Sequence, residues 1–279
     1  MAMTIAPNGI GGYSITQKLV RPVVYLDHWA VRLFADDGSM QKRFIEALHR
    51  SQGTWLFSNA NIMEFIAMTD LQQAASGERL LLRAMPALYV ADTTLDKGFL
   101  FVEGVAEHPD APDQHWLLHD LGARAAIVGG TWNTHRFLQD AINAKEQLLP
   151  LFVAMKAGVS KAVMALTKDE RRHHNAVRFR PAPGMTLRDA LSAELIRDPH
   201  IDTRYVFDDN DAMDFIHAVP AAVVADLILL DAGWCHKIER ATKRLRRGGV
   251  TGKLATCYSK RSIDEFLGAL ESWKMPSSG

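Results

Sequence analysis

The sequence predicts an α/β fold built on a central parallel sheet. Three short apolar runs, at 22–26, 54–57 and 227–230, have the length of buried strands, and each leads into a segment with helical spacing. Strands that alternate with helices are typical of strand–helix–strand units, whose strands run parallel. The long stretch between these units, 100–206, is mostly helical in pattern. We therefore expect a sheet core with a mostly helical insertion.

The first part of the core is expected to alternate strand and helix. Trp55, Leu56 and Phe57 form a short buried strand, and Phe44 and Leu48 share one face of a helix. The expected elements are, in order, strand 22–26, helix 28–35, helix 39–50, strand 54–57, a helix that begins near Asn59 or Asn61, and strand 87–95.

The α/β pattern returns after the insertion. Residues 114–166 have the composition of almost continuous helix, and 168–206 is rich in Pro and Arg, with one helix at 186–197. The elements expected after residue 209 are helix 211–225, strand 227–230, helix 234–246, a weak strand at 253–258 and helix 262–273. We therefore assign 1–20 to an N-terminal extension, 21–99 and 207–279 to the core, and 100–206 to the insertion.

Composition is that of an ordinary globular protein. Of the 279 residues 48% are apolar and 23% are charged, and 32 basic residues balance 32 acidic ones, so net charge indicates no polyanionic partner. Cys235 and Cys257 match neither a metal motif nor a disulfide framework, which fits a reduced compartment. The N-terminus lacks signal-peptide features, and the most apolar run, 218–230, is too short to span a membrane. We expect a cytoplasmic protein without a membrane segment.

Four carboxylates follow strands or begin helices, and each has a structural explanation. Asp27 ends the run "VVYL" and Asp231 ends "LILL", and aspartate is among the best helix N-caps. Glu64 completes a capping box with Asn61. Asp214 lies one turn into a helix, where negative charge is favourable. Taken singly, each structural explanation is about as good as a functional one.

Taken together, the four carboxylates predict a metal site. The carboxyl ends of parallel strands lie on one edge of a sheet, where α/β proteins bind ligands. Four carboxylates at one edge repel each other unless cations neutralise them, and hard oxygen ligands suit Mg²⁺ or Mn²⁺. Two such ions about 3.5–4 Å apart can activate water and stabilise the leaving oxygen of a phosphodiester. The expected catalytic and metal-binding residues are Asp27, Glu64, Asp214 and Asp231.

The segments "VVYLDHWAV", "LFSNANIMEF" and "DAMDFIHAVPAAVVADLILLDAGW" resemble the acidic motifs of PIN-domain nucleases. The resemblance covers roughly 20–75 and 207–260. It implies a three-layer α/β/α PIN-like fold that cuts RNA, usually single-stranded, with Mg²⁺ or Mn²⁺ held by the same four carboxylates. Leu229 stands where a hydroxyl residue is frequent in the family. The motifs are also similar to those of a PIN-like subgroup of bacterial proteins, some of them toxin-like. A further alternative is therefore a toxin whose activity is held off by an inhibitory protein partner.

Further residues are candidates for supporting roles and for binding nucleic acid. His217 shares a helix face with Asp214, and Ser58 ends its strand; a buried structural histidine and a helix cap are the competing explanations. Two basic runs, 168–180 and 239–253, can neutralise phosphates, although such runs are more often solvated helix faces. The candidates for contacts with nucleic acid are Arg171, Arg172, Arg240, Lys243 and Arg244.

Other enzyme classes lack their motifs. "RGGVTGKL" is not a P-loop, no serine elbow or dinucleotide fingerprint occurs, and Trp29 stands where an aspartyl phosphatase needs a second Asp. We therefore expect a metal-dependent nuclease that acts on single-stranded RNA. The alternative is a catalytically weak PIN-like module that binds nucleic acid or a protein partner, and the sequence leaves self-association open.

Overall fold

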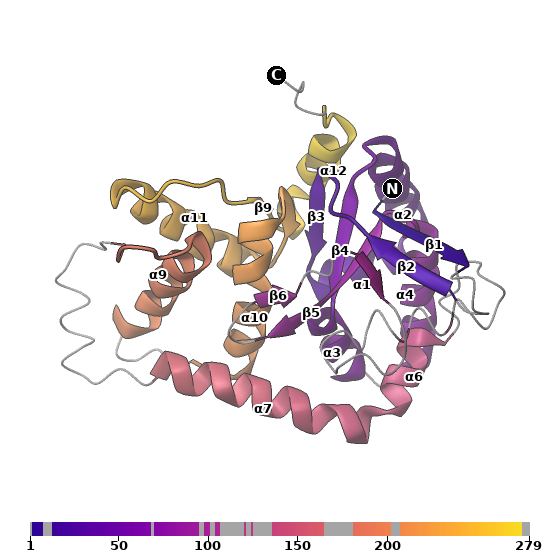
Figure 1. The fold of residues 1–279 in the computed structure, drawn as a ribbon, viewed down its shortest axis with the longest axis horizontal. Helices are drawn as coiled ribbons and strands as arrows, with labels where there is room; N and C mark the ends of the chain where they lie inside the picture. The colour runs from indigo at the N-terminus through magenta and orange to yellow at the C-terminus, as the bar shows by residue number, and fades with distance from the viewer. Residues whose placement is uncertain are drawn as a thin grey trace.

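The computed structural model describes residues 2–7, 13–67, 70–94, 98–100, 104–106, 120, 124, 136–164, 181–201 and 207–274. Its main sheet has six strands in the order β6-β5-β4-β3-β8-β9 (Figure 1). These strands are β3 (Val23–Leu26), β4 (Thr54–Ser58), β5 (Leu88–Thr94), β6 (Gly98–Leu100), β8 (Leu227–Leu229) and β9 (Thr256–Tyr258). β6 is antiparallel to β5, whereas the other five strands are parallel. The predicted parallel α/β sheet is confirmed.

Helices cover both faces of this sheet. Val24 and Leu26 pack on one face with Phe34 and Phe266, whereas Tyr25 packs on the other face in the second apolar core. One layer is formed by α1 (His28–Asp36), α2 (Gly38–Arg50), α3 (Asn59–Ala67), α4 (Leu71–Ala84) and α12 (Ile263–Glu271). The other is formed by α9 (Leu187–Ile201), α10 (Asp209–Val224) and α11 (Ala232–Arg247). The three-layer α/β/α arrangement is therefore confirmed.

The strand order brings distant parts of the chain together. β3 pairs with β4 through Val24 and Trp55, and with β8 through Val24 and Leu227. All residues of these three strands are buried, so their sequences are continuous apolar runs rather than alternating ones. Because β3 and β8 are parallel neighbours, the aspartates that follow them, Asp27 and Asp231, lie at the same edge of the sheet.

Asp226 lies at the opposite edge of the sheet, just before β8. Its carboxylate accepts a hydrogen bond from the backbone N–H of Val23 (2.9 Å), forms an ion pair with Arg21 and lies 3.5 Å from Lys253 Nζ. The aspartate side chain is 1% exposed. Asp226 therefore fastens the start of β8 to the start of β3 and is a structural residue.

A second, antiparallel sheet was not predicted. It contains β1 (Met3–Pro7), β2 (Tyr13–Gln17) and β7 (Gly104–Ala106), so strands occur both in the segment 1–20 and in the segment expected to be mostly helical. The side-chain amide of Gln17 joins this sheet to β5, because it donates to Val90 O (3.1 Å) and accepts from Val90 N (2.7 Å). Helix α4 was also missed.

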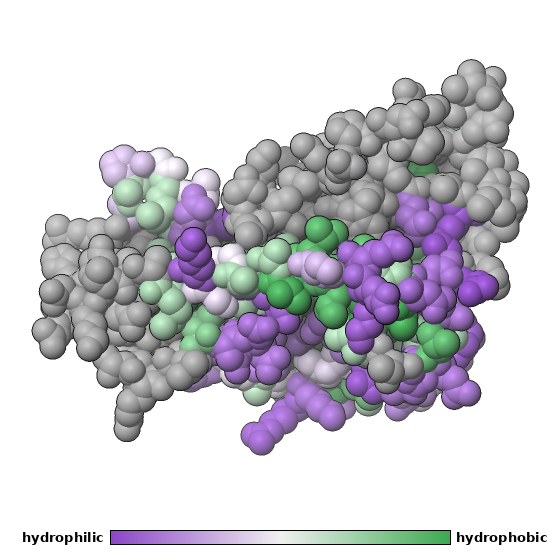
Figure 2. Space-filling view, turned by 90° about the horizontal axis from the view of Figure 1, so that it is seen from below, coloured by the Kyte–Doolittle hydropathy of each residue, from purple (hydrophilic) through white to green (hydrophobic). Residues whose placement is uncertain are grey.

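Part of the insertion is helical, as expected. α6 (Phe137–Asn143) and α7 (Lys145–Met164) lie along one side of the molecule (Figure 1), whereas most of 107–135 and all of 165–180 fall outside the described residues. α7 has the length and mean hydropathy (1.2) of a membrane span, and 17% of that stretch is buried. Figure 2 shows apolar residues along this side, and Leu151 is 64% exposed. α7 also contacts α10, where Lys156 forms an ion pair with Asp209 (3.3 Å).

Candidate active site

Asp27 and Asp231 both cap the helices that follow their strands. The Asp27 carboxylate accepts from His28 N (2.7 Å), and the Asp231 carboxylate accepts from Gly233 N (2.6 Å) and Trp234 N (3.1 Å). These bonds satisfy backbone donors at the starts of α1 and α11. The capping explanation is therefore correct for both residues, and any further role of either must come from what surrounds its other oxygen.

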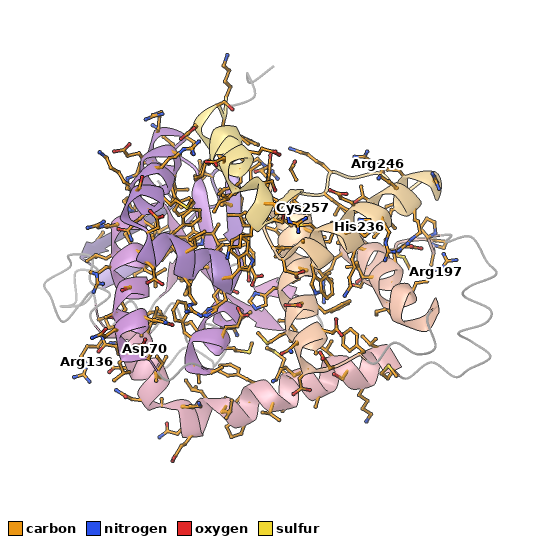
Figure 3. All side chains as sticks on the ribbon, turned by 180° about the vertical axis from the view of Figure 1, so that it is seen from behind. Asp70, Arg136, Arg197, His236, Arg246 and Cys257 are labelled. Atoms are coloured by element: carbon orange, nitrogen blue, oxygen red, sulfur yellow. The ribbon has the colours of Figure 1, made fainter. Side chains whose placement is uncertain are left out.

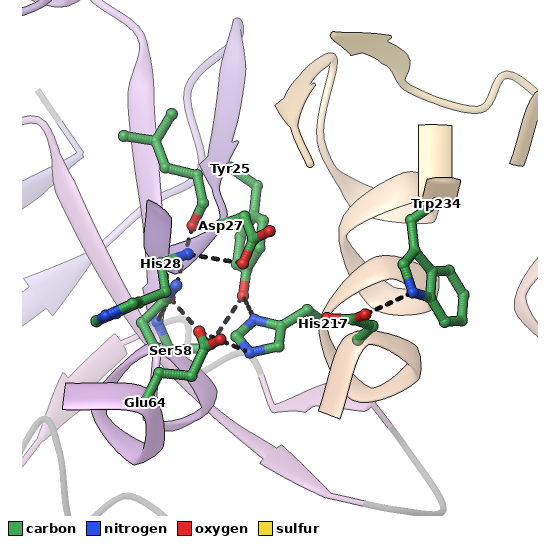
Figure 4. A network of polar contacts seen from close by, with 10 residues as sticks. Tyr25, Asp27, His28, Ser58, Glu64, His217 and Trp234 are labelled. Atoms are coloured by element: carbon green, nitrogen blue, oxygen red, sulfur yellow. Dashed lines mark hydrogen bonds and ion pairs between the residues drawn. The ribbon is translucent and has the colours of Figure 1, made fainter. Parts of the chain in front are cut away.

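The predicted carboxylates are gathered around one small pocket at the carboxyl edge of β3 and β8. Asp27, Asp214 and Asp231 line it together with His217 and Trp234. Glu64, on α3, lies beside this pocket, in contact with His217 (Figure 4). The four acids come from four different elements, and the strand order is what brings them together.

Glu64 does not form the predicted capping box. Asn61 is occupied elsewhere, because its Oδ1 accepts from Ser58 N (2.9 Å) and its Nδ2 donates to Leu26 O (2.9 Å). Glu64 instead faces His217, with Oε2 3.1 Å from Nε2, although the two atoms are not aligned as a hydrogen bond. Glu64 Oε2 is thus a buried carboxylate oxygen without a hydrogen-bond partner in the described part of the chain.

His217 connects Glu64 to the sheet. Its ring is buried, and Nδ1 is hydrogen-bonded to the hydroxyl of Tyr25 (Figure 4). Burial raises the pKa of Tyr25 well above its ordinary value, so this hydroxyl keeps its proton. It donates to Nδ1 of the neutral imidazole and accepts from Nδ1–H of the protonated one. Burial lowers the pKa of His217, but the carboxylates of Glu64 and Asp27 raise it more, and the net pKa is above its ordinary value.

Ser58 takes part in the same network from the end of β4. Its hydroxyl lies 3.5 Å from the Tyr25 hydroxyl and donates to Asn61 Oδ1 (3.3 Å). Because Ser58 is fully buried, it contributes to the positions of Tyr25 and Asn61 behind the carboxylates. The cap expected for Ser58 is replaced by this buried network.

The pocket is electrostatically unfavourable for its own carboxylates. Burial, with the charge of Glu64, raises the pKa of Asp27 to about 7. Burial, with the charge of Asp231, raises the pKa of Asp214 to about 6. The charge that most opposes these shifts is that of His217 in both cases. Perturbed acids of this kind gather at functional sites more often than elsewhere.

Trp234 and Lys237, both on α11, are components of the site that the sequence did not reveal. The indole Nε1–H of Trp234 donates to Asp214 Oδ2 (2.7 Å), as Figure 4 shows. Lys237 Nζ lies 4.2 Å from the centre of the Trp234 ring and 3.3 Å from Asp211 Oδ1. The only signal in the sequence was their spacing, since Trp234 is three residues after Asp231 and Lys237 three residues later, on one helix face.

The donor set has the chemistry that Mg²⁺ and Mn²⁺ prefer, since it offers several carboxylates and one buried oxygen without a hydrogen bond. Nevertheless, within the described ranges no three His, Cys, Asp or Glu side chains are placed so that they could hold a metal ion. Asp214 is engaged by Trp234, and His217 stands beside Glu64. The carboxylates would have to turn toward one another to share a cation.

The basic candidates lie away from the pocket or have other partners. Arg244 forms an ion pair with the buried Glu194 and so fastens α9 to α11. Arg240 and Lys243 are exposed, about 13 and 18 Å along α11 from Asp231 at 1.5 Å per residue. Figure 3 shows this direction, with His236 near the start of α11 and Arg246 near its end. Arg171 and Arg172 lie outside the described residues.

Comparison of the chain with protein-family models, with curated proteins and with solved structures finds no match.

Proposed function

We propose that this protein is a metal-dependent nuclease that hydrolyses phosphodiester bonds of single-stranded RNA at the pocket of Asp27, Glu64, Asp214 and Asp231. The observation that carries the proposal is the buried Glu64 Oε2, which has no hydrogen bond in the described part of the chain and lies beside Asp27, whose pKa is about 7. The four carboxylates carry more negative charge than the single imidazole of His217 can balance, which suits the site to a divalent cation.

Each side chain of the pocket has a definite part in this proposal. Asp27, Glu64, Asp214 and Asp231 would hold Mg²⁺ or Mn²⁺, which supplies charge to polarise a phosphate and lower the pKa of water. His217 positions Glu64, and Tyr25 in turn positions the His217 ring. Trp234 holds Asp214 through its indole N–H.

The decisive experiment is cleavage of a labelled single-stranded RNA with Mn²⁺ or Mg²⁺. Asp27→Asn and Glu64→Gln should each lower the rate by about 10²–10³-fold, as expected when a group that stabilises charge in the transition state is lost. Asp37→Asn is the matched control, because Asp37 also caps a helix, α2, through Ser39 N (2.9 Å) and Met40 N (3.0 Å) but lies outside the pocket. Equal loss in all three variants would mean that the carboxylates matter only as caps and structural groups.

A module that binds nucleic acid without cutting it is the second candidate. The hydrogen bond from Trp234 to Asp214 favours it, because a carboxylate held by an indole N–H is less available to a cation. The expected result is salt-sensitive binding of RNA without cleavage in either metal. Metal-dependent cleavage by the wild type would exclude it.

A further inference from the structure

A second pocket adjoins the acidic one and has a different chemical character. It measures about 290 Å³ and is lined by Trp29, Asp231, Ala232, Ser259, Lys260 and Arg261. These residues come from the starts of α1 and α11 and from the turn after β9, which all lie at the carboxyl edge of the sheet. Asp231 lines both pockets, so the two lie side by side at this edge of the sheet.

The lining suits a flat aromatic ring. Trp29 is partly buried and packs against the apolar core below it, so its indole is held in a fixed position. Its Nε1–H is buried and has no hydrogen-bond partner in the described residues, although buried N–H groups are nearly always paired. Because this atom is closed to solvent, the part of Trp29 that a bound group can contact in the pocket is the exposed part of its ring.

The rim of the pocket suits a phosphate. Lys260 and Arg261 are consecutive and exposed, and neither forms an ion pair within the described ranges. They lie next to the pocket lined by carboxylates, so positive and negative side chains are adjacent at this edge of the sheet. Cations neutralise the phosphates of a nucleic acid, and an aromatic side chain stacks on its bases.

We propose that this pocket binds one nucleotide of single-stranded RNA, with the base against Trp29 and the phosphate on Lys260 and Arg261, next to the phosphodiester that is cut. The assignment rests on the proposed nuclease function. The volume is at the lower end for ligand sites, which fits a single nucleotide rather than a folded surface. Only an unpaired base can leave its neighbours and stack in this way.

The test is binding of a fluorescein-labelled octauridylate, measured by fluorescence anisotropy in EDTA so that nothing is cut. Trp29→Ala should weaken binding about 10-fold, as expected for the loss of one stacked base, and Trp29→Phe much less. Arg261→Gln should weaken binding and reduce the slope of log affinity against log salt by about 0.7. Arg50→Gln is the matched control, since Arg50 is an exposed arginine at the opposite edge of the sheet.

An octamer with abasic sites in place of uracil tests stacking without changing the protein. The wild type should bind this oligomer about 10-fold more weakly than it binds octauridylate. In Trp29→Phe the difference in affinity between the two oligomers should be smaller. Equal affinity of the two oligomers, or of the wild type and Arg261→Gln, would overturn the proposal. No affinity of the wild type for either oligomer would also overturn it and leave the pocket to a protein segment.

The design separates this proposal from the nuclease function. Binding in EDTA that depends on Trp29 and Arg261, together with an absence of cleavage in Mn²⁺, supports the pocket and refutes the nuclease. Cleavage that depends on Asp27 but is unchanged in Trp29→Ala and Arg261→Gln refutes the pocket alone. Circular dichroism shows whether Trp29→Ala folds. If it does not, the affinity of Arg261→Gln for octauridylate tests the proposal.

Discussion

Two buried aspartates at opposite ends of neighbouring strands differ in how their charge is balanced. Asp226, before β8, has Arg21, Lys253 and the Val23 N–H around its carboxylate. Asp27, after β3, is surrounded by other acids, and its pKa is raised to about 7 by burial and by Glu64. The charge of Asp226 stabilises the fold, whereas the fold holds the charge of Asp27 at a cost in free energy. A held charge of the second kind is the stronger indication of function.

The largest effect on stability is expected at the balanced aspartate. Asp226→Ala removes a carboxylate that fastens β8 to β3 and leaves the Val23 N–H without its acceptor. Breaking such a buried pair should lower the free energy of unfolding by about 2–3 kcal/mol, since the exposure of Arg21 weakens the ion pair through solvent screening. Urea unfolding measures this change. A loss of less than about 0.5 kcal/mol, the size expected for a surface substitution, would contradict the role given to Asp226.

The opposite sign is expected at Asp27. Asn keeps the cap on α1 but removes the penalised charge, so Asp27→Asn should raise the free energy of unfolding at pH 8 by about 2 kcal/mol. The folded-state pKa is above the unfolded one, so the wild type is most stable below about pH 4 with respect to this group and loses that stability as pH rises through 7. The gain in Asp27→Asn should therefore appear between pH 4 and 8 and be absent at pH 4.

The control for this prediction is Asp37→Asn, which changes a cap without changing the pocket. Its free energy of unfolding should stay parallel to that of the wild type across the same pH range. A stabilisation of Asp37→Asn equal to that of Asp27→Asn would assign the effect to the cap rather than to the cluster.

A bound divalent cation should balance the charge of Asp27 and so reduce its difference from Asp226, whose charge is already balanced. If the pocket binds Mn²⁺, a concentration 100-fold above the dissociation constant adds about 2.7 kcal/mol to stability, and a chain of this size gains about 2–4 °C in Tm per kcal/mol. Differential scanning fluorimetry with Mn²⁺ should show an increase in Tm for the wild type and for Asp37→Asn, but little increase for Glu64→Gln. A shift of equal size in Glu64→Gln would place the ion elsewhere.

The smallest effect is expected at Trp234. Trp234→Phe keeps an aromatic ring under Lys237 but removes the donor to Asp214 Oδ2, and that hydrogen bond lowers the pKa of Asp214. The pKa of Asp214 should therefore increase above about 6 in the variant, which carboxyl ¹³C NMR titration measures. A lower pKa would mean that the indole acts mainly by excluding water.

The sequence predicted the parts of the site that local patterns specify. Strands buried on both faces are continuous apolar runs, so β3, β4 and β8 were recognisable, and Asp27 and Asp231 were recognisable as the residues that end two of them. The parallel order then required both to lie at one edge, which the structure confirms.

Contacts between distant residues were beyond such patterns. Tyr25 and His217 are 192 positions apart, and no local rule pairs them. Asn61 matched a capping box with Glu64, but tertiary contacts to Ser58 and Leu26 used its side chain instead. The antiparallel sheet was missed because β1 and β2 are mixed in composition, unlike the apolar β3, β4 and β8, and its third strand, β7, comes from a distant segment.

The strand order also determines when the sheet can be completed during synthesis. β3 leaves the ribosome early, but its neighbour β8 follows roughly 200 residues later, which takes about 10–40 s at ordinary translation rates. Until then one edge of β3, an entirely apolar strand, has no partner, and open edges of this kind recruit other chains. Chaperones that protect nascent chains should therefore affect the yield of this protein more than they affect a sheet whose neighbouring strands are consecutive in the chain.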